Sequence, residues 1–184
     1  MTEAPHPLRE RILVCRCQAG DERAFEEIVS TYGPRLRYYL LKQLGSPEAA
    51  DDVVQEVWLD VYRGIVRLRR PDAFRAWIYR IARDRAFRVL RRARVPCRLA
   101  DEADLPAAEA EDDGFSAEDA VRVHAALDRL SPLHREVLLL RFIEDLPYDE
   151  IAQITGCPAG TVKSRLHHAK RVLRQEMERE DDHE

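Results

Sequence analysis

The charged residues of this chain are separated into blocks, and this separation limits how the chain can fold. Residues 63–98 contain 13 arginines and 2 acidic residues, whereas residues 99–119 contain 9 acidic residues and no basic one. The acidic block has few large apolar side chains, so it cannot bury enough surface to fold by itself. We therefore expect a flexible acidic linker at residues 97–116 that divides the 184-residue chain into two small domains.

Apolar residues on both sides of the linker recur every three or four residues, which is the spacing of a helix face. In the first domain, which we place at residues 15–96, Asp21 and Ser46 are suited to cap helices. Gly33 and Pro34 are expected to interrupt the helical chain and restart it. The expected core positions are Phe25, Ile28, Tyr32, Leu36, Leu40, Val53, Val57, Val61, Phe74, Ile78 and Ile81. The sequence predicts an all-α protein.

The second domain, which we place at residues 117–176, has a sequence typical of a helix-turn-helix, and residues 177–184 form a charged tail. A short apolar helix ends near Gly156, which allows a tight turn, and Pro158 begins a second helix. The inward positions of that second helix are Val162, Leu166, Ala169 and Leu173. Basic residues on its outer face predict DNA binding. A purely structural helical hairpin is the alternative.

Several other classes of function lack support in the sequence. The chain has no run of roughly 18 apolar residues and begins with no secretion signal, so we expect a cytoplasmic protein with no membrane insertion. Cys15, Cys17, Cys97 and Cys157 do not have zinc-ligand spacing, and free thiols are expected, although a redox or metal role for Cys15 and Cys17 stays open. No phosphate-binding loop or nucleophile motif is present. We expect neither an enzyme nor a cofactor or metal site.

The arginine block itself has two interpretations. A positive surface of this density is suited to a polyanion such as a nucleic acid. A solvated helix face is the alternative, although such faces usually mix charges of both signs. The aromatic residues Trp77 and Tyr79 lie within the block, and flat side chains among cations can stack on exposed bases.

Five segments in sequence order resemble bacterial sigma factors of the extracytoplasmic-function (ECF) group. Residues 21–36 and 52–58 are similar to the opening of the conserved region two, and residues 74–83 are similar to its DNA-melting helix. Residues 130–142 and 151–166 are similar to the first part and the helix-turn-helix of region four. The resemblance covers nearly the whole chain apart from the linker and the tail.

This resemblance implies that the protein binds core RNA polymerase and promoter DNA, both double-stranded and melted, and that an anti-sigma factor holds it inactive. The acidic linker either imitates nucleic acid near the RNA path or serves as a solubilising tether. Two other functions compete with this one. A transcriptional regulator that acts without polymerase explains the helix-turn-helix but not the Trp77 helix. A metal-dependent or nucleophilic enzyme lacks any supporting motif.

The resemblance and the residue chemistry together predict three sets of contacts. Binding and melting of the minus-ten element are assigned to Arg67, Arg69, Arg70, Trp77, Tyr79, Arg80, Arg83, Asp84, Arg85, Arg88, Arg91 and Arg92. Recognition of the minus-thirty-five element is assigned to Thr161, Lys163, Ser164, Arg165, His167, His168, Lys170, Arg171 and Arg174. Docking on polymerase is assigned to Asp52, Gln55, Glu56 and Leu59, which share a helical stripe. For Trp77, a place in the core is an equally supported alternative.

Three positions depart from the family pattern. Asp84 stands where asparagine is common, and a carboxylate there disfavours phosphate but accepts a hydrogen bond from cytosine. Pro147 replaces a serine cap, and His168 replaces a basic residue. His168 therefore predicts weaker or pH-sensitive contacts to the minus-thirty-five element.

Overall fold

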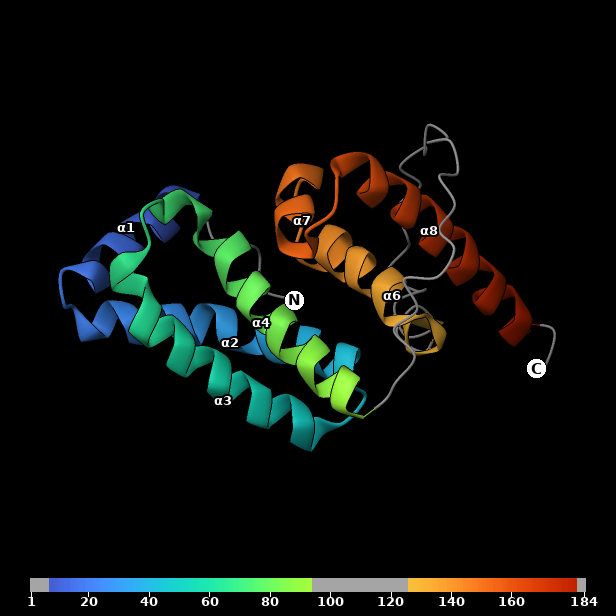
Figure 1. Cartoon of the computed structure of the whole chain (residues 1–184), viewed down its shortest axis with the longest axis horizontal. Helices are drawn as coiled ribbons and strands as arrows, with labels where there is room; N and C mark the ends of the chain where they lie inside the picture. Colours follow the sequence, from blue (N-terminus) through green and yellow to red (C-terminus); the bar gives the residue numbers. More distant parts are fainter. Residues whose placement is uncertain (1–6, 94–125, 182–184) are drawn as a thin grey trace. The chain divides into compact units, whose positions relative to one another are not determined.

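The computed structural model describes residues 7–93 and 126–181, which are helical apart from short turns (Figure 1). These residues contain no strand, so the predicted all-α fold is confirmed. They fall into two compact units, the first with helices α1 to α4 and the second with α6, α8 and most of α7. The predicted linker and Cys97 lie outside the described residues.

The first unit is a bundle in which α2 packs against α1, α3 and α4, and α3 packs against α4. The longer helices are α1 (Pro7–Gln18), α2 (Glu22–Leu44), α3 (Pro47–Gly64) and α4 (Phe74–Arg92). Two short 3-10 segments, η1 (Ile65–Arg67) and η2 (Pro71–Ala73), connect α3 to α4. Helix α1 begins well before residue 15, the expected start of the first domain, and is not among the helices expected from the sequence.

The predicted interruption at Gly33 and Pro34 is wrong, because α2 runs through both residues as one helix. Proline in a helix interior removes a backbone hydrogen bond and strains the preceding turn. The packing of α2 compensates for this cost, since its buried side chains continue on either side of the proline. They are Ala24, Ile28, Tyr32, Leu36, Tyr39 and Leu40.

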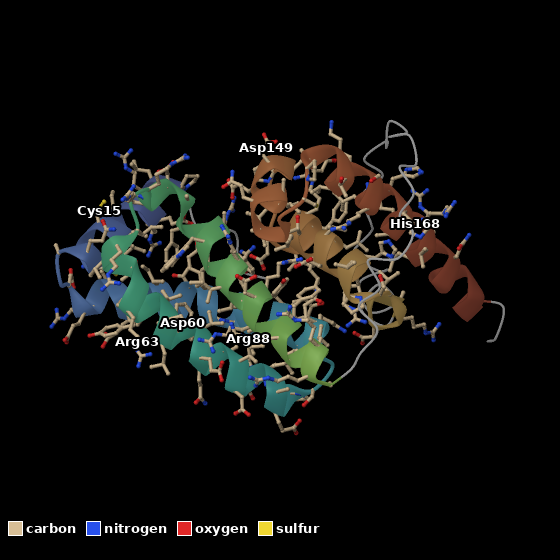
Figure 2. All side chains as sticks on the ribbon, viewed as in Figure 1. Cys15, Asp60, Arg63, Arg88, Asp149 and His168 are labelled. Atoms are coloured by element: carbon tan, nitrogen blue, oxygen red, sulfur yellow. The ribbon has the colours of Figure 1, made fainter. Side chains whose placement is uncertain are left out.

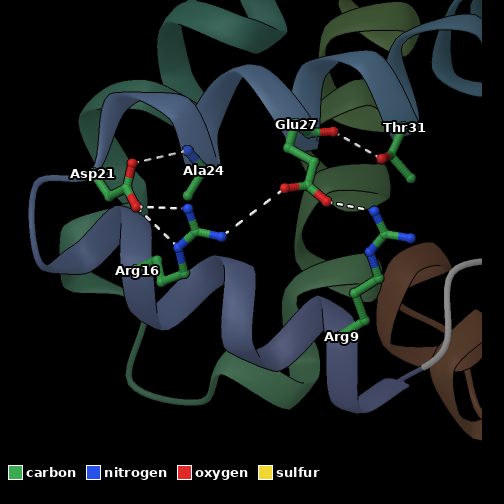
Figure 3. A network of polar contacts seen from close by, with 6 residues as sticks. All are labelled: Arg9, Arg16, Asp21, Ala24, Glu27 and Thr31. Atoms are coloured by element: carbon green, nitrogen blue, oxygen red, sulfur yellow. Dashed lines mark hydrogen bonds and ion pairs between the residues drawn. The ribbon is translucent and has the colours of Figure 1, made fainter.

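The helix ends follow the sequence rules. The side chains of Asp21 and Ser46 accept hydrogen bonds of 3.2 Å from the backbone N–H groups of Ala24 and Ala49. Gly45 ends α2 with a left-handed φ of 71°, a conformation that favours glycine. Figure 3 shows that Arg16 on α1 also donates to Asp21 at 2.9 Å. This hydrogen bond and the one from Ala24 hold the pKa of Asp21 below its ordinary value.

In the second unit, α6 (Pro132–Leu138) packs against α8 (Ala159–Asp181), and α7 (Tyr148–Thr155) precedes α8 across the turn at Gly156. A π-helical segment, η3 (Leu139–Ile143), continues α6. Residues 126–129 are also helical. Gly156 has a φ of 71°, as the predicted tight turn requires. The inward positions of α8 are buried as predicted, at Val162, Leu166, Ala169 and Leu173.

Arg135 joins α6 to the segment before it. Its Nε donates to the carbonyl of Leu127 at 2.8 Å, and its Nη2 donates to the carbonyls of Asp128 and Leu130 at 2.9 and 2.8 Å. These carbonyls lie at the end of the helical residues 126–129. The buried guanidinium thus supplies donors to carbonyls at the end of this helix, of which that of Leu127 also accepts from the backbone N–H of Leu130 at 3.2 Å. Burial lowers the pKa of Arg135 below its ordinary value.

We expect Arg135→Met to destabilise the second unit by about 2 kcal/mol or more, because buried carbonyls would lose their donors. The free energy of unfolding of the second unit, obtained by urea denaturation with hydrogen exchange at residues 126–173 as the probe, measures this loss. The matched control is Arg92→Met, which changes an exposed arginine at the end of α4. Equal stability of the two variants would contradict the role assigned to Arg135.

Candidate nucleic-acid and protein interfaces

The arginines of α4 differ in exposure, because they lie on different sides of the helix relative to its buried stripe. One stripe of the helix is buried in the first unit, at Phe74, Ala76, Ile78, Tyr79, Ala82, Ala86 and Leu90. The exposed arginines of α4 and of the segment before it are Arg67, Arg69, Arg70, Arg80, Arg88, Arg91 and Arg92. Figure 2 labels Arg88 on α4, and Asp60 and Arg63 on α3. Arg70 also pairs with Asp72 at 2.9 Å.

Arg85 differs from these arginines because its charge is already compensated inside the unit. Its Nε and Nη2 donate to Oδ2 of Asp60 at 2.9 and 2.6 Å, and its Nη1 donates to Glu56. The hydrogen bonds that Arg85 donates to Asp60 raise the pKa of Arg85 above its ordinary value. This bridge between α3 and α4 argues against Arg85 as a phosphate contact. It also gives Glu56 an intramolecular partner.

Tyr79 is not available to nucleic acid. Its side chain is fully buried, and its ring lies against that of Tyr39 on α2 with a centroid separation of 5.5 Å. The prediction that Tyr79 stacks on a base is wrong for this fold, because the ring would have to leave the core. Tyr79 falls on the same buried stripe as Ala82 and Ala86.

Trp77 is half-buried, which agrees both with a place in the core and with a ring that can stack on a base. Its centroid lies 6.0 Å from that of Phe74 with the ring planes tilted by 52°, and its six-membered ring lies close to the backbone of Gly64. Part of the indole is thus packed and part is accessible.

Arg83 and Asp84 occupy different environments on the same helix. The Arg83 guanidinium lies 4.6 Å from the ring centroid of Phe87, and its side chain is only 19 % exposed. Asp84 is 60 % exposed, and its carboxylate lies 4.0 Å from Arg83. A carboxylate is therefore accessible among the arginines of α4.

In the helix-turn-helix, Lys163, His167, Arg171 and Arg174 are exposed on α8. Thr161 and Ser164 are half-buried, and the Ser164 hydroxyl donates to the carbonyl of Thr161 at 3.0 Å. Lys170 is half-buried, with its Nζ 4.8 Å from the ring centroid of Phe142. One face of α8 thus carries most of the predicted contacts for the minus-thirty-five element.

Arg165 does not belong to that face. It is buried, and its Nη1 lies 3.6 Å from the Sγ of Cys157. Its prediction as a DNA contact is therefore contradicted. Arg165 immediately precedes the buried Leu166 and turns inward with it.

Tyr148 and Arg141 belong to this surface but are not among the contacts predicted from the sequence. The Tyr148 ring, at the start of α7, has the guanidinium of Arg141 5.4 Å from its centroid and the Nζ of Lys163 5.7 Å from it. Such distances are typical of cation–π contacts. An aromatic residue directly at the start of the first helix of the helix-turn-helix was the available sequence signal.

The adjacent histidines of α8 point to different surroundings, as expected from helix geometry. His167 is exposed, whereas the His168 ring lies against that of His134 in α6, with a centroid separation of 4.6 Å and the ring planes tilted by 40°. Arg171 Nη2 lies 3.0 Å from His168 Nδ1. Since a guanidinium can only donate, Nδ1 is the acceptor of this bond.

The predicted polymerase-binding stripe lies on the exposed side of α3. Asp52, Gln55 and Leu59 are exposed, and Glu56 is the residue shared with Arg85. The stripe continues into apolar residues that the sequence analysis missed, Tyr62 and Val66, which are 60 % and 59 % exposed. Phe25 on α2 supports it, with ring centroids 6.1 Å from Trp58 and 5.2 Å from Tyr62.

The cysteines in the described residues are free. Cys15 is exposed and Cys17 is buried. Burial, together with the negative charge of Asp21, raises the pKa of the Cys17 thiol to about 11. Among residues 7–93 and 126–181, no three His, Cys, Asp or Glu side chains are grouped to hold a metal ion. No helix in these ranges has the length and apolar character needed to span a membrane.

Comparisons with known proteins agree with the two-unit organisation. Residues 28–95 match the family described as Sigma-70 region 2, and residues 120–173 match Sigma-70, region 4.

Relatives resemble the chain over most of its length. It is 31 % identical to the RNA polymerase sigma-H factor of Pseudomonas aeruginosa, over 90 % of this chain and 92 % of that protein. It is 32 % identical to the ECF RNA polymerase sigma-E factor of Haemophilus influenzae, over 93 % of this chain and 96 % of that protein.

Two solved structures share the fold. CnrH, in complex with the cytosolic domain of CnrY, has a TM-score of 0.67 at 24 % identity, covering 91 % of this chain and 96 % of that chain. The sigma factor RpoE of Bartonella quintana, in complex with the anti-sigma factor NepR, has a TM-score of 0.66 at 22 % identity, covering 84 % and 96 %.

Proposed function

The chain belongs to the ECF group of RNA polymerase sigma factors, and from that membership we propose that it guides core polymerase to promoters and helps to melt them. A sigma factor is a transcription initiation factor and not an enzyme. The observation that carries the proposal is the presence of two different basic surfaces. One combines exposed arginines with a partly accessible indole on α4, and the other is the outer face of α8.

The α4 surface is suited to a melted minus-ten element. Exposed arginines such as Arg80 and Arg88 offer charge to the phosphates of separated strands, and Trp77 offers a flat ring to an unpaired base. A stacked base contributes about 1–3 kcal/mol, which is enough to favour an open strand locally. Asp84, exposed among these arginines, is suited to accept a hydrogen bond from cytosine.

Run-off transcription with core polymerase tests this assignment directly. We expect Trp77→Ala to lower the transcript yield on a duplex promoter by about tenfold, the effect of losing one stacked base. A template with a pre-opened bubble should restore most of the yield, since strand opening is already done. Circular dichroism controls for folding. Equal losses on both templates would remove Trp77 from the melting step.

The α8 surface is suited to a duplex minus-thirty-five element in the manner of a recognition helix. Lys163 lies near the start of α8 and is exposed, so it is our principal candidate for a base edge. Arg171 and Arg174 are candidates for phosphates. Arg141 and Tyr148 extend the surface beyond the predicted set, since both cations on the Tyr148 ring can reach a nearby phosphate.

We expect Lys163→Ala to weaken binding to the minus-thirty-five duplex by about 1–3 kcal/mol and to relax the base preference at one position. Arg174→Ala should instead weaken binding to all sequences similarly, as loss of a phosphate contact does. Binding to a promoter library with randomised minus-thirty-five positions distinguishes the two. An unchanged base preference for Lys163→Ala would exclude it from base recognition.

The α3 stripe is the proposed docking surface for core polymerase. It combines acidic Asp52 and polar Gln55 with the exposed apolar side chains of Leu59, Tyr62 and Val66. An apolar centre with a charged rim is the usual composition of a protein interface. Glu56 contributes to the shape of the stripe through its bond to Arg85.

We expect Asp52→Lys to lower the affinity for core polymerase, because reversed charge at an interface strongly disfavours the partner. The matched control is Glu26→Lys, which makes the same change at an exposed position of α2. Fluorescence anisotropy with labelled full-length chain measures both affinities. Wild-type affinity of a folded Asp52→Lys variant would contradict the assigned docking surface.

We further propose that an anti-sigma factor regulates this chain and that it acts in the cytoplasm, where its polymerase partner works. The complex of RpoE with the anti-sigma factor NepR supports the idea by the similarity of fold. The exposed apolar residues of α3 give such a partner a surface that it can cover in competition with polymerase.

A further inference from the structure

Gly64 is unusual among the glycines at helix ends. It is the last residue of α3, with φ −97° and ψ −25°, which is the ordinary right-handed helical region. Gly45 and Gly156, by contrast, end their helices with the left-handed φ of 71° that makes glycine favourable. At a right-handed position alanine is the better helix former. The backbone of Gly64 therefore gives no reason for a glycine.

The reason lies in the indole of Trp77. A Cβ placed on Gly64 would lie 2.8 Å from Cζ2 of that ring, closer than real Cβ atoms approach a neighbour, and 3.1 Å from Cη2, which is a tight contact. The outer edge of the indole therefore occupies the space that any side chain at residue 64 would need. Gly33, within α2, is a useful contrast, since in the described part of the chain no atom lies within 4 Å of a Cβ built there.

We propose that Gly64 is a positioning residue for Trp77, in that the bare backbone at the end of α3 sets the place and the plane of the indole on α4. The proposal rests on the function assigned to Trp77 above. The Phe74 ring also lies beside the indole, with centroids 6.0 Å apart and ring planes tilted by 52°, so the indole packs against both Phe74 and Gly64 while part of it stays accessible. A ring held in advance in one plane avoids an ordering cost when a base stacks on it.

The position of the ring can be measured without polymerase or DNA. The chain has 2 tryptophans, so Trp58→Phe leaves Trp77 as the single fluorophore. In that background we expect Gly64→Ala to displace the indole, shift its emission and raise its quenching by acrylamide. Gly33→Ala should leave both unchanged. If Gly64→Ala changes neither the emission nor the acrylamide quenching, Gly64 does not position the indole and the proposal is wrong.

The consequence for strand opening is measured with the holoenzyme on duplex and pre-opened promoters. We expect Gly64→Ala to lower the duplex yield by up to about tenfold, the range set by one stacked base, with little loss on the pre-opened template. Trp77→Phe provides the rescue, because a phenyl ring lacks the outer indole atoms that collide. Gly64→Ala should therefore lower the duplex yield when residue 77 is tryptophan and leave it unchanged when combined with Trp77→Phe.

Each remaining outcome decides one of the two claims. If Gly64→Ala lowers the transcript yield equally on the duplex and the pre-opened template, with or without Trp77→Phe, Gly64 has a structural role only and the proposal is overturned. If Gly64→Ala moves the indole but Trp77→Ala leaves strand opening intact, the melting role of Trp77 is wrong, and so is the functional part of this inference. The packing of the indole against Gly64 would still be supported. If Trp77→Ala impairs opening and Gly64→Ala does not, the positioning role alone is wrong.

Discussion

The packing of α4 against α2 and α3 is the constraint on which the first unit depends. Burial of one continuous stripe, from Phe74 to Leu90, fixes the rotation of the helix about its axis and so decides where every other residue points. Arginines near that stripe meet the acids of α3, as Arg85 meets Asp60, whereas those opposite it stay exposed, as Arg88 does. The arginines of this block thus have two different roles in the fold. One set forms ion pairs between helices, and the other is exposed and available to an external polyanion.

The same logic operates in the second unit, where α6 packs against α8. The buried residues Val162, Leu166 and Ala169 fix the rotation of α8, so Lys163 faces outward. Arg165, next to Leu166, is carried inward to Cys157. The contact of the His168 ring with that of His134 adds a polar element to this interface between helices, and it places an imidazole where the family commonly has a basic residue. The two units therefore present their cations by the same physical means, although they serve different states of DNA in the proposed function.

Sequence reasoning identified the helices that follow α1, the caps and the helix-turn-helix, because these depend on local patterns. It placed Asp21 and Ser46 correctly as caps and the inner face of α8 correctly as buried. It failed at Pro34, where tertiary packing keeps α2 continuous in spite of a local helix breaker. It also failed for Tyr79 and Arg165, because residue type alone does not tell which side of a helix is buried when aromatic and basic residues lie on both sides. The contacts of Tyr148 with Arg141 and Lys163, and of Gly64 with Trp77, join residues on different elements, which no helical spacing reveals.

The central claim is that helix packing sorts the arginines of α4 into intramolecular and DNA-binding groups. The salt dependence of promoter binding by the holoenzyme tests it most directly, because each phosphate contact adds about one unit to the slope of log affinity against log salt concentration. The account predicts that Arg88→Gln lowers the slope by about one unit, whereas Arg85→Gln leaves it unchanged, since its charge already belongs to Asp60 and Glu56. A lowered slope for Arg85→Gln, or an unchanged slope for Arg88→Gln, would contradict the account.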